Sequence, residues 1–337
     1  MAVGGSDAHT SHHINQVSSY LDASTVYGSS VCAAQSLRDG ALLRFIIQLS
    51  KLNVMTLTLS RWTENPLNPT NLLPLLPTTR THPDCRAVDG NCFLAGDDRV
   101  NEQPGLAVFH TVMMREHNNI ATKLGKINRH WGPDKLFLET RRIIGALVQH
   151  ITFSEFLPRI LGRHVLDGFG LRLLPSGYYK GHDSQCSGAV FNEFATAAFR
   201  FGHSLIRPNL TLMSEEQAKM GWEEGGKRAR NVPLREVFNN PKLLFQGELD
   251  NLVRGMVMSP MMTMDRVVTS EVTNHLFQEK NKRSGMDLAA LNIQRGRDHG
   301  LAGYNAYRAV CGLPPASKFD DLLPHVPISQ VSLLEKV

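Results

Sequence analysis

The sequence predicts a mainly α-helical domain with long irregular loops and few or no strands. Apolar residues recur every three to four positions over residues 134–156, the spacing of an amphipathic helix. Residues 189–206 are apolar on nearly every side, which is typical of a helix buried on several sides. Two segments, 50–82 and 168–188, are rich in Pro, Gly, Asn or Thr and predict extended or irregular loops.

The first two expected helices have clear boundary signals. Residues 106–124 follow Pro104 and stop before Gly125, and residues 134–156 follow Pro133. Proline suits the first turn of a helix because the amide hydrogen that it lacks would have no partner there. Glycine readily ends a helix. We therefore expect both segments to form long helices.

Further helices are expected along the rest of the chain. The apolar segment 189–206 should end before Pro208. Neither an internal repeat nor a linker divides the sequence, so we expect residues 1–337 to form one domain. The remaining expected helices span residues 242–256, 265–278 and 287–309.

Charge and hydropathy exclude two classes of partner. The chain has 337 residues with 36 Lys and Arg against 31 Asp and Glu, a net charge of +5 without any basic run. A nucleic-acid-binding protein would concentrate positive charge on one face or arm. No stretch approaches the roughly 18 consecutive apolar residues of a membrane span. We expect neither a nucleic-acid partner nor a membrane span.

The cysteines and one glycosylation motif indicate an oxidising, extracellular compartment. Cys85 and Cys92 flank a short loop that a disulfide can close. Asn209-Leu210-Thr211 is an N-glycosylation motif. The first residues lack the basic and apolar regions of a signal peptide, so we expect the chain to belong to a longer secreted protein. Three cysteines remain and cannot all pair with one another, so a disulfide-linked partner outside the chain is expected: Cys32, Cys186 and Cys311.

His203 is the first candidate site residue. It follows Arg200-Phe201-Gly202 within the apolar segment. Gly202 lets a flat group approach the imidazole, and Arg200 lies on the same side of the helix, where haem propionates would neutralise it. Imidazole is a common axial ligand of haem iron. The alternative is a core histidine bonded to a backbone carbonyl group.

Asn292 is the second candidate. A histidine that binds a metal normally donates its other ring N–H to an acceptor, and the side-chain oxygen of Asn292 can be that acceptor. Arg295, three residues later, would share the same side of a helix. The alternative is a polar surface helix. Arg295 and three charged neighbours are expected to form ion pairs, and a purely structural role is open for this part of the segment: Arg297, Asp298 and His299.

Two further patterns suggest chemistry. Arg99 and Glu102 stand three residues apart at the start of an expected helix, where an arginine can stabilise negative charge on a leaving oxygen. An N-terminal acidic cap with a surface arginine is the alternative. Oxygen-bearing side chains alternate along residues 18–24 and suit calcium, although a polar serine-rich loop would look the same. His110 and His117 share one helix face and could bind a metal, but they lack a known metal-binding spacing.

Together these segments resemble the animal haem peroxidase family, whose fold is largely helical. The resemblance runs in the family's order from residue 14 to about 315, which is nearly the whole chain. Several collinear blocks are far more specific than any one of them. The matching blocks are residues 14–28, 92–97 with 99 and 101–103, 115–118, 199–203, 291–295 with 297–300, 303–305 and 311–314.

The resemblance implies roles for the candidate residues. His203 looks like the proximal ligand of the iron of a b-type haem, with Asn292 holding its far nitrogen. Arg99 looks like the distal arginine that polarises bound peroxide. Glu102 matches the carboxylate that forms an ester bond to a haem methyl group. Two arginines near the haem correspond to Arg200 and Arg295.

The resemblance also implies a calcium site and a disulfide. Cys85 and Cys92 match a short family disulfide, and Cys311 matches a cysteine whose partner lies further along the family's chain. The calcium loop of the family corresponds to Ser18, Tyr20 through its backbone carbonyl group, Asp22 and Ser24.

One segment of the family has no match. Family members carry a distal histidine upstream of the calcium loop, preceded by a Gln and by the Asp of a second haem ester. The histidines in this region lie too close to the loop and lack those neighbours: His9, His12 and His13. The chain also stops at Val337, before the family's final helices. We expect a partial domain, and loss of a distal base typically lowers the rate about 10²–10⁴-fold.

The resemblance implies a haem-dependent peroxidase that reduces hydrogen peroxide while oxidising a halide or a phenol. Two alternatives remain open. One is a non-catalytic, peroxidase-like scaffold that binds calcium or matrix partners, which the unmatched distal segment favours. The other is a dioxygenase-type relative that acts on fatty acids.

Overall fold

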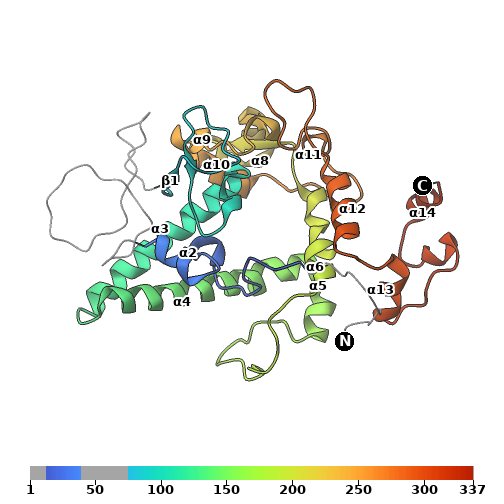
Figure 1. Ribbon diagram of the computed structural model, residues 1–337, viewed down its shortest axis with the longest axis horizontal. Helices are drawn as coiled ribbons and strands as arrows, with labels where there is room; N and C mark the ends of the chain where they lie inside the picture. Colours follow the sequence, from blue (N-terminus) through green and yellow to red (C-terminus); the bar gives the residue numbers. More distant parts are fainter. Residues whose placement is uncertain (1–12, 39–74, 337) are drawn as a thin grey trace.

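The computed structural model describes residues 13–38 and 75–336, and helices dominate it (Figure 1). Strands in the described residues are limited to two short antiparallel pairs. The expectation of a mainly helical fold with long loops and few strands is confirmed. Up to residue 168 the elements are α1 (Ser24–Tyr27), α2 (Val31–Ser36), β1 (Thr78–Thr79), β2 (Cys92–Phe93), the 3-10 helix η1 (Asp98–Asn101), α3 (Pro104–Ile127), α4 (Pro133–Ile151), the π-helical turn η2 (Thr152–Phe156) and α5 (Leu157–Gly168).

The remaining elements are mostly short. None of the described helices has the length and apolar character that a bilayer crossing requires. From residue 192 onward the elements are α6 (Asn192–Thr196), η3 (Ala198–Leu205), β3 (Asn209–Leu212), α7 (Glu215–Lys219), α8 (Gly221–Arg228), β4 (Arg230–Pro233), η4 (Leu234–Glu236), α9 (Lys242–Phe245), α10 (Leu249–Met258), α11 (Ser270–Thr273), α12 (Leu288–Asp298), α13 (Tyr304–Val310), η5 (Phe319–Leu322) and α14 (Ile328–Leu334).

The two long helices expected from the sequence form a hairpin. α3 and α4 pack side by side and are joined by a short turn (Figure 1). The Gln103 side chain accepts a hydrogen bond from the N–H of Gly105 at 2.7 Å, and Pro104 occupies the first position of α3. Pro133 starts α4 in the same way. Both predicted helices and their proline starts are confirmed, and η2 prolongs α4 to Phe156.

One core surrounds this hairpin. Buried side chains from α1, β2, α3, α4, α9, α10 and α11 form a single cluster. Burial of this apolar area is the main favourable term for folding. The largest side chains in the cluster with almost no exposed surface are Tyr27, Leu76, Phe93, Met114, Ile144, Leu244 and Leu252.

The prediction of a helix over residues 189–206, buried on several sides, is wrong in two respects. The segment forms the short helices α6 and η3, because Ala197 (φ −136°, ψ −68°) leaves the helical conformation. Its aromatic side chains are largely exposed: Phe191 is 77% and Phe199 is 54% exposed. They lie outside the core cluster, and Phe194 stacks on Phe199 at 5.0 Å instead.

Three other predicted helices are interrupted by backbone turns. The segment 242–256 splits into α9 and α10 at Gly247, whose φ is 84°. The segment 287–309 splits into α12 and α13 at Gly300, whose φ is 62°. Only α11 forms within 265–278, because Leu276 pairs with Met286 in an isolated antiparallel bridge. Local apolar spacing did not reveal these turns.

The expected irregular segments are present where the structure describes them. Residues 169–191 contain no helix or strand. Of the segment 50–82, residues 50–74 lie outside the described residues, and residues 75–82 contain only the short strand β1. The expected disulfide joins Cys85 to Cys92, with 5.8 Å between their Cα atoms. The other three cysteines are free and exposed: Cys32, Cys186 and Cys311.

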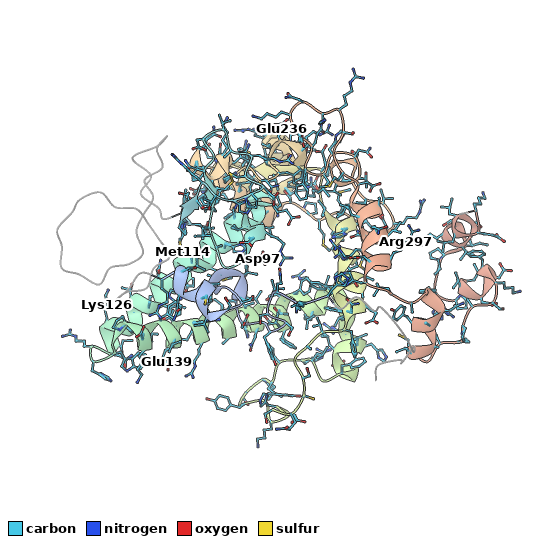
Figure 2. All side chains as sticks on the ribbon, in the orientation of Figure 1. Asp97, Met114, Lys126, Glu139, Glu236 and Arg297 are labelled. Atoms are coloured by element: carbon cyan, nitrogen blue, oxygen red, sulfur yellow. A yellow bond between two sulfur atoms is a disulfide. The ribbon has the colours of Figure 1, made fainter. Side chains whose placement is uncertain are left out.

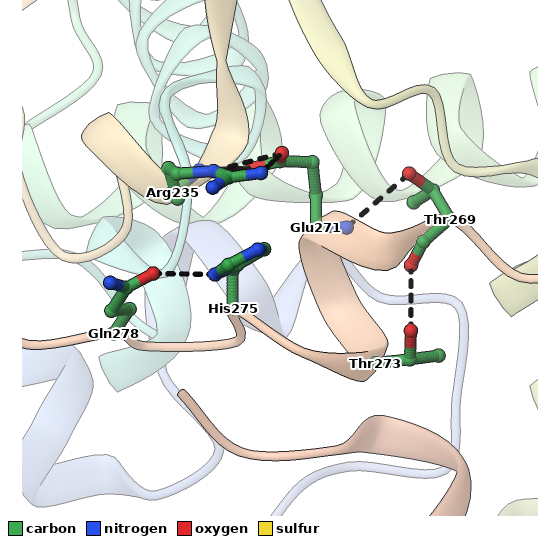
Figure 3. Close-up of polar contacts among 6 residues, drawn as sticks. All are labelled: Arg235, Thr269, Glu271, Thr273, His275 and Gln278. Atoms are coloured by element: carbon green, nitrogen blue, oxygen red, sulfur yellow. Dashed lines mark hydrogen bonds and ion pairs between the residues drawn. The ribbon is translucent and has the colours of Figure 1, made fainter. Parts of the chain in front are cut away.

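An ion pair ties η4 to α11 (Figure 3). The Glu271 carboxylate, with 6% of its side chain exposed, accepts hydrogen bonds from the backbone N–H of Arg235 at 3.0 Å and from its Nε at 2.9 Å. The Thr269 side chain caps α11 by accepting from the N–H of Glu271. Just beyond, the His275 ring lies 2.6 Å from Oε1 of Gln278. This network fixes the loop that leads towards α12.

Candidate functional site

Two segments far apart in the sequence bring His203 and Asn292 together. His203 lies in η3 and Asn292 in α12, and the Nδ1 atom of His203 is 2.9 Å from the Nδ2 atom of Asn292. The Asp287 side chain caps α12 by accepting from the N–H of Ala289 at 2.8 Å, which fixes the start of the helix that carries Asn292. Both facing side chains are half-buried.

Arg200 is the third member of this group. Its Nη1 atom donates a hydrogen bond to the Oδ1 atom of Asn292 at 2.7 Å. The sequence suggested that the oxygen of Asn292 would face the imidazole of His203, and here the amide is turned the other way. The reason is chemical: a guanidinium group has only N–H donors, so it takes the amide oxygen and leaves the NH₂ group towards His203.

The surroundings of this group are electropositive. Burial and the nearby Arg295 lower the pKa of Arg200, and burial together with Arg200 lowers the pKa of His203. The Nε atom of Arg200 is buried and has no hydrogen-bond partner among the described residues. No acidic side chain in the described part of the chain forms an ion pair with Arg200. A cation in this state favours an anionic ligand.

Space is available next to the imidazole. A Cβ atom built at Gly202 would have nothing within 4 Å, so the chain leaves that side of η3 open. The sequence predicted that this glycine would let a flat group approach His203, and the open space is in keeping with that prediction.

The charged end of α12 forms a second cluster. Arg295 pairs with Asp298 at 3.6 Å, so the expected ion pairing is present. The Nδ1 atom of His299 donates a hydrogen bond to the side-chain oxygen of Asn192 at 2.8 Å. The His299 ring stacks on that of His13, with 3.9 Å between the ring centres. The contact with His13 spans most of the chain, and the sequence offered no signal for it beyond the presence of both histidines.

This second cluster is a weak candidate for a metal. The ligand atoms of His13, Asp298 and His299 lie within 4.8 Å of one another, and they form the one such group among the described residues. The two rings are stacked with an angle of 8° between their planes. Lone pairs in parallel, stacked planes cannot converge on one ion as tetrahedral coordination requires.

Arg99 lies in η1, away from this group. Its guanidinium binds the Asp97 carboxylate through Nε at 2.9 Å and Nη2 at 2.6 Å, and 66% of the Arg99 side chain is exposed. This bidentate pairing raises the pKa of Arg99 and lowers that of Asp97. In Figure 2, Asp97 lies near the centre of the view and Arg297 lies to its right. Within the described residues, no hydrogen bond or ion pair joins Arg99 to the His203 group.

Glu102 closes the 3-10 turn η1 and is half-buried. Burial raises the pKa of its carboxyl group, and the charge of Arg99 opposes that shift. Its backbone oxygen accepts a hydrogen bond from the N–H of Asn239 at 3.2 Å. Asn239 is itself buried and adopts a left-handed conformation with φ 53°. Glu102 is thereby held by a residue distant in sequence.

The segment expected to bind calcium folds around Asp22. One carboxylate oxygen of Asp22 accepts from the hydroxyl group of Ser18 at 3.0 Å, and the other accepts from the N–H of Ser24 at 2.9 Å. The Ser18 hydroxyl also accepts from the N–H of Tyr20 at 3.2 Å. The loop packs on α4, where Gln149 donates to the Leu21 carbonyl group at 3.0 Å. Two of the four expected oxygen donors, the Ser18 hydroxyl group and the Asp22 carboxylate, are thus in direct contact, and the backbone of Tyr20 and Ser24 folds around them.

His110 and His117 do not form a metal site. Both are buried on α3 and each has its own partner in the core. His110 contacts the carbonyl oxygen of Leu106 at 2.7 Å through Nδ1, and His117 contacts the hydroxyl group of Tyr27 at 2.6 Å. Among the described residues they are not part of any group of potential ligands. The shared helix face therefore reflects core packing.

Comparison with known proteins places this geometry in context. The family model described as animal haem peroxidase matches residues 3–337. The chain is 40% identical over 322 residues to the human (Homo sapiens) peroxidasin homolog. The matched region covers 92% of this chain and 19% of that protein. It is 37% identical over 312 residues to pig (Sus scrofa) thyroid peroxidase, covering 92% of this chain and 31% of that protein. It therefore spans less than a third of either relative.

Solved structures give the same fold. Peroxidase A from Dictyostelium discoideum matches with a TM-score of 0.68 and 28% identity, over 94% of this chain and 54% of that one. A fatty acid alpha-dioxygenase from Oryza sativa matches with a TM-score of 0.60 and 16% identity, over 89% of this chain and 48% of that one. The second likeness concerns the fold alone.

Proposed function

Because the chain belongs to the animal haem peroxidase family, we propose that it serves a haem-dependent peroxidase that reduces hydrogen peroxide while oxidising a halide or phenolic donor. The observation that carries this proposal is the contact between His203 and Asn292. A metal-binding histidine donates its second ring N–H to an acceptor. Asn292 lies at that nitrogen, and its amide oxygen, which accepts from Arg200 in this structure, is the group that can accept there. We further propose that the whole chain forms one domain, since most of the buried apolar side chains in the described residues belong to one cluster.

The residues around His203 fit a haem. The imidazole is half-buried beside open space at Gly202, as a flat macrocycle requires. The unpartnered, buried Nε atom of Arg200 suits a propionate oxygen, and Arg295 adds positive charge nearby. Haem, when bound, supplies the redox chemistry that cleaves peroxide. His203 would hold its iron, while Asn292 orients the ring and the two arginines bind the propionates.

The residues of η1 have proposed roles on the opposite side of the haem. Arg99 would stabilise negative charge that develops on the leaving oxygen of peroxide, and its pairing with Asp97 fixes its position. Glu102 would attach a haem methyl group through an ester. Its carboxyl group has a raised pKa through burial, so it is held partly out of water. Neither role involves a contact with His203.

We propose calcium as a second cofactor, bound by the loop around Asp22. Hydroxyl, carboxylate and carbonyl oxygens are the ligands that calcium prefers. The Ser18 hydroxyl group already contacts the Asp22 carboxylate, and the backbone N–H of Ser24 bonds to the same carboxylate. The proposed ligands are Ser18, Tyr20 through its carbonyl group, Asp22 and Ser24. We also propose an extracellular protein with a disulfide-linked partner, which the Cys85–Cys92 disulfide and the three exposed cysteines support.

The test is an absorption titration of the purified chain with haemin. A sharp Soret band is expected from the native chain and should be lost or shifted in His203→Ala. His117→Ala is the control, because that histidine is buried and has a core partner. Identical broad spectra from the native chain and both variants would refute the haem proposal for this chain.

Turnover assays then separate the reaction classes. Peroxide-dependent oxidation of iodide or guaiacol supports a peroxidase. Oxygen uptake with palmitate but not with peroxide would favour the dioxygenase alternative. Haemin binding without either reaction would favour a non-catalytic scaffold.

A further inference from the structure

The contact between Arg200 and Asn292 determines which ring nitrogen of His203 carries the proton. Arg200 donates from Nη1, so the atom of Asn292 at 2.7 Å accepts and is the amide oxygen. The other end of the amide is the NH₂ group, which is a donor only. It lies 2.9 Å from the Nδ1 atom of His203, so Nδ1 presents its lone pair there. The proton of the neutral imidazole then resides on Nε2.

This tautomer is the opposite of the one that a metal ligand needs. A ring nitrogen that carries a hydrogen has no in-plane lone pair to give to a metal. Metal-binding histidines normally donate their non-ligating N–H to an acceptor. Here the non-ligating nitrogen faces a donor, so the histidine is held in a form that does not bind iron through Nε2.

Among the described residues, Arg200 alone keeps the amide oxygen of Asn292 turned away from His203. With Arg200 elsewhere, the Asn292 amide can rotate by half a turn and offer its oxygen to Nδ1–H at the same position. With Arg200 in place, that rotation would bring the amide NH₂ group against the guanidinium N–H at 2.7 Å, which is two donors face to face.

Three features favour release of Arg200 from Asn292 when an anion is available. Its partner is a neutral amide, its Nε atom is unpartnered and buried, and Arg295 repels it. A guanidinium forms stronger, bidentate hydrogen bonds with a carboxylate than with an amide oxygen. A carboxylate that arrives with a ligand would thus compete favourably for Arg200.

We infer that Arg200 is a positioning residue that couples anion binding to the ability of His203 to bind a metal. When a carboxylate binds Arg200, the Asn292 amide rotates and its oxygen faces Nδ1 of His203. The ring proton of His203 then passes through solvent from Nε2 to Nδ1, without net uptake or release of a proton. The lone pair of Nε2 is then free. This inference rests on the proposed haem site for the identity of the anion, a haem propionate, but the tautomer itself is a property of the chain without haem.

The first experiment needs no haem. The tautomer of His203 is read from long-range ¹H–¹⁵N correlations of ¹⁵N-histidine-labelled chain, with His203→Ala assigning the signal. We expect Nε2–H in the native chain and a shift of population towards Nδ1–H in Arg200→Met. Arg200→Lys retains N–H donors and should restore Nε2–H. Arg129→Met, an exposed arginine in the turn between α3 and α4, is the matched control and should not change the signal.

Asn292→Asp provides a second, independent variant. A carboxylate accepts from both sides, so it can hold Arg200 and Nδ1–H together, and Nδ1–H is expected with Arg200 still present. If the native chain already shows Nδ1–H, or if Arg200→Met and Asn292→Asp both keep Nε2–H, the inference is overturned.

The second experiment compares haemin with its dimethyl ester, which lacks the carboxylates. The native chain should bind haemin at least about tenfold more tightly than the ester, and Asn292→Asp should reduce that preference because its ring is already in the binding form. An equal preference in the native chain and in Asn292→Asp contradicts the coupling. Failure of the native chain to bind either compound, with the expected tautomers still observed, would count against the proposed function and leave the coupling within the chain standing.

Discussion

The α3–α4 hairpin and the contact between η3 and α12 place histidines in opposite settings. His117 on α3 is fully buried, and the hydroxyl group of Tyr27 lies 2.6 Å from its ring. His203 in η3 is half-buried, lies beside open space at Gly202, and contacts Asn292. In the sequence His117 stands between the charged and polar residues Glu116 and Asn118, whereas His203 lies in an apolar segment. The difference teaches that the chemistry of such a histidine is decided by what faces each ring nitrogen.

The two regions should also differ in what they contribute to stability. Ile144 on α4 is completely buried in the core, so Ile144→Ala should lower the free energy of unfolding by about 2–5 kcal/mol. Urea unfolding measures this. Leu138→Ala on the same helix, where the side chain is 53% exposed, is the control and should cost less. A loss below about 1 kcal/mol for Ile144→Ala would show that the hairpin is not the main source of stability.

The disulfide tests whether the hairpin side can be weakened without disturbing the η3–α12 contact. Replacement of Cys85 and Cys92 by serine frees a loop with a sequence separation of 7 and should cost about 2–3 kcal/mol. Chemical unfolding of oxidised native chain and double variant gives the value. Haemin affinity should stay unchanged, since among the described residues no hydrogen bond joins the side chain of either cysteine to η3 or α12. A parallel loss of affinity would mean that the two regions are coupled.

The buried histidine should make stability depend on pH. Burial, assisted by Arg38, lowers the pKa of His117 from 6.5 to about 3, so the folded state keeps the ring neutral. Below pH 6.5 the unfolded chain takes up a proton on His117, whereas the folded chain does not. The contribution of the neutral ring to the free energy of unfolding is therefore complete above pH 6.5 and is lost as the pH falls towards 3. At pH 5 the loss is about 2 kcal/mol.

The variant that isolates this effect is His117→Leu, which should be less sensitive to pH. Unfolding free energies are compared at pH 7.5 and pH 5 for native chain, His117→Leu and the exposed control His150→Leu. If His117→Leu loses as much stability between those pH values as the native chain does, the buried ring is not the source.

The smallest effect is expected on the open side. Phe199 in η3 is 54% exposed and lies outside the core, so Phe199→Ala should change the free energy of unfolding by no more than about 0.5 kcal/mol. The same urea titration applies. A loss of unfolding free energy above about 2 kcal/mol in Phe199→Ala would show that this aromatic face is covered in solution. The two regions would then contribute to stability more equally.

Local signals in the sequence were sufficient for the long helices. Proline at the first turn and apolar spacing predicted α3 and α4, and cysteine spacing predicted the one disulfide. They failed where a turn depends on a distant partner. The bridge of Leu276 with Met286 and the positive φ of Gly247 interrupt segments whose apolar spacing alone favours a helix.

The candidate site shows the same division. The rule that a metal-binding histidine donates its other ring N–H to an acceptor, together with the family resemblance, led to His203 and Asn292, and the two side chains do meet. The orientation of the amide could not be predicted, because it depends on which of two neighbours takes the oxygen. That choice belongs to Arg200 and is visible only when three side chains are placed together. His13 beside His299 was missed for the same reason.

Asn239 has a consequence for how this protein can change during evolution. It is buried at φ 53° and donates its N–H to the carbonyl oxygen of Glu102, while its own carbonyl group accepts from the N–H of Arg86 at 2.9 Å. Few side chains tolerate that backbone geometry, chiefly glycine, asparagine and aspartate, whereas β-branched residues are strongly disfavoured. Position 239 should therefore admit a narrow set of substitutions even though its side chain performs no chemistry. The substitutions accepted at position 239 would therefore reflect the backbone conformation that supports Glu102.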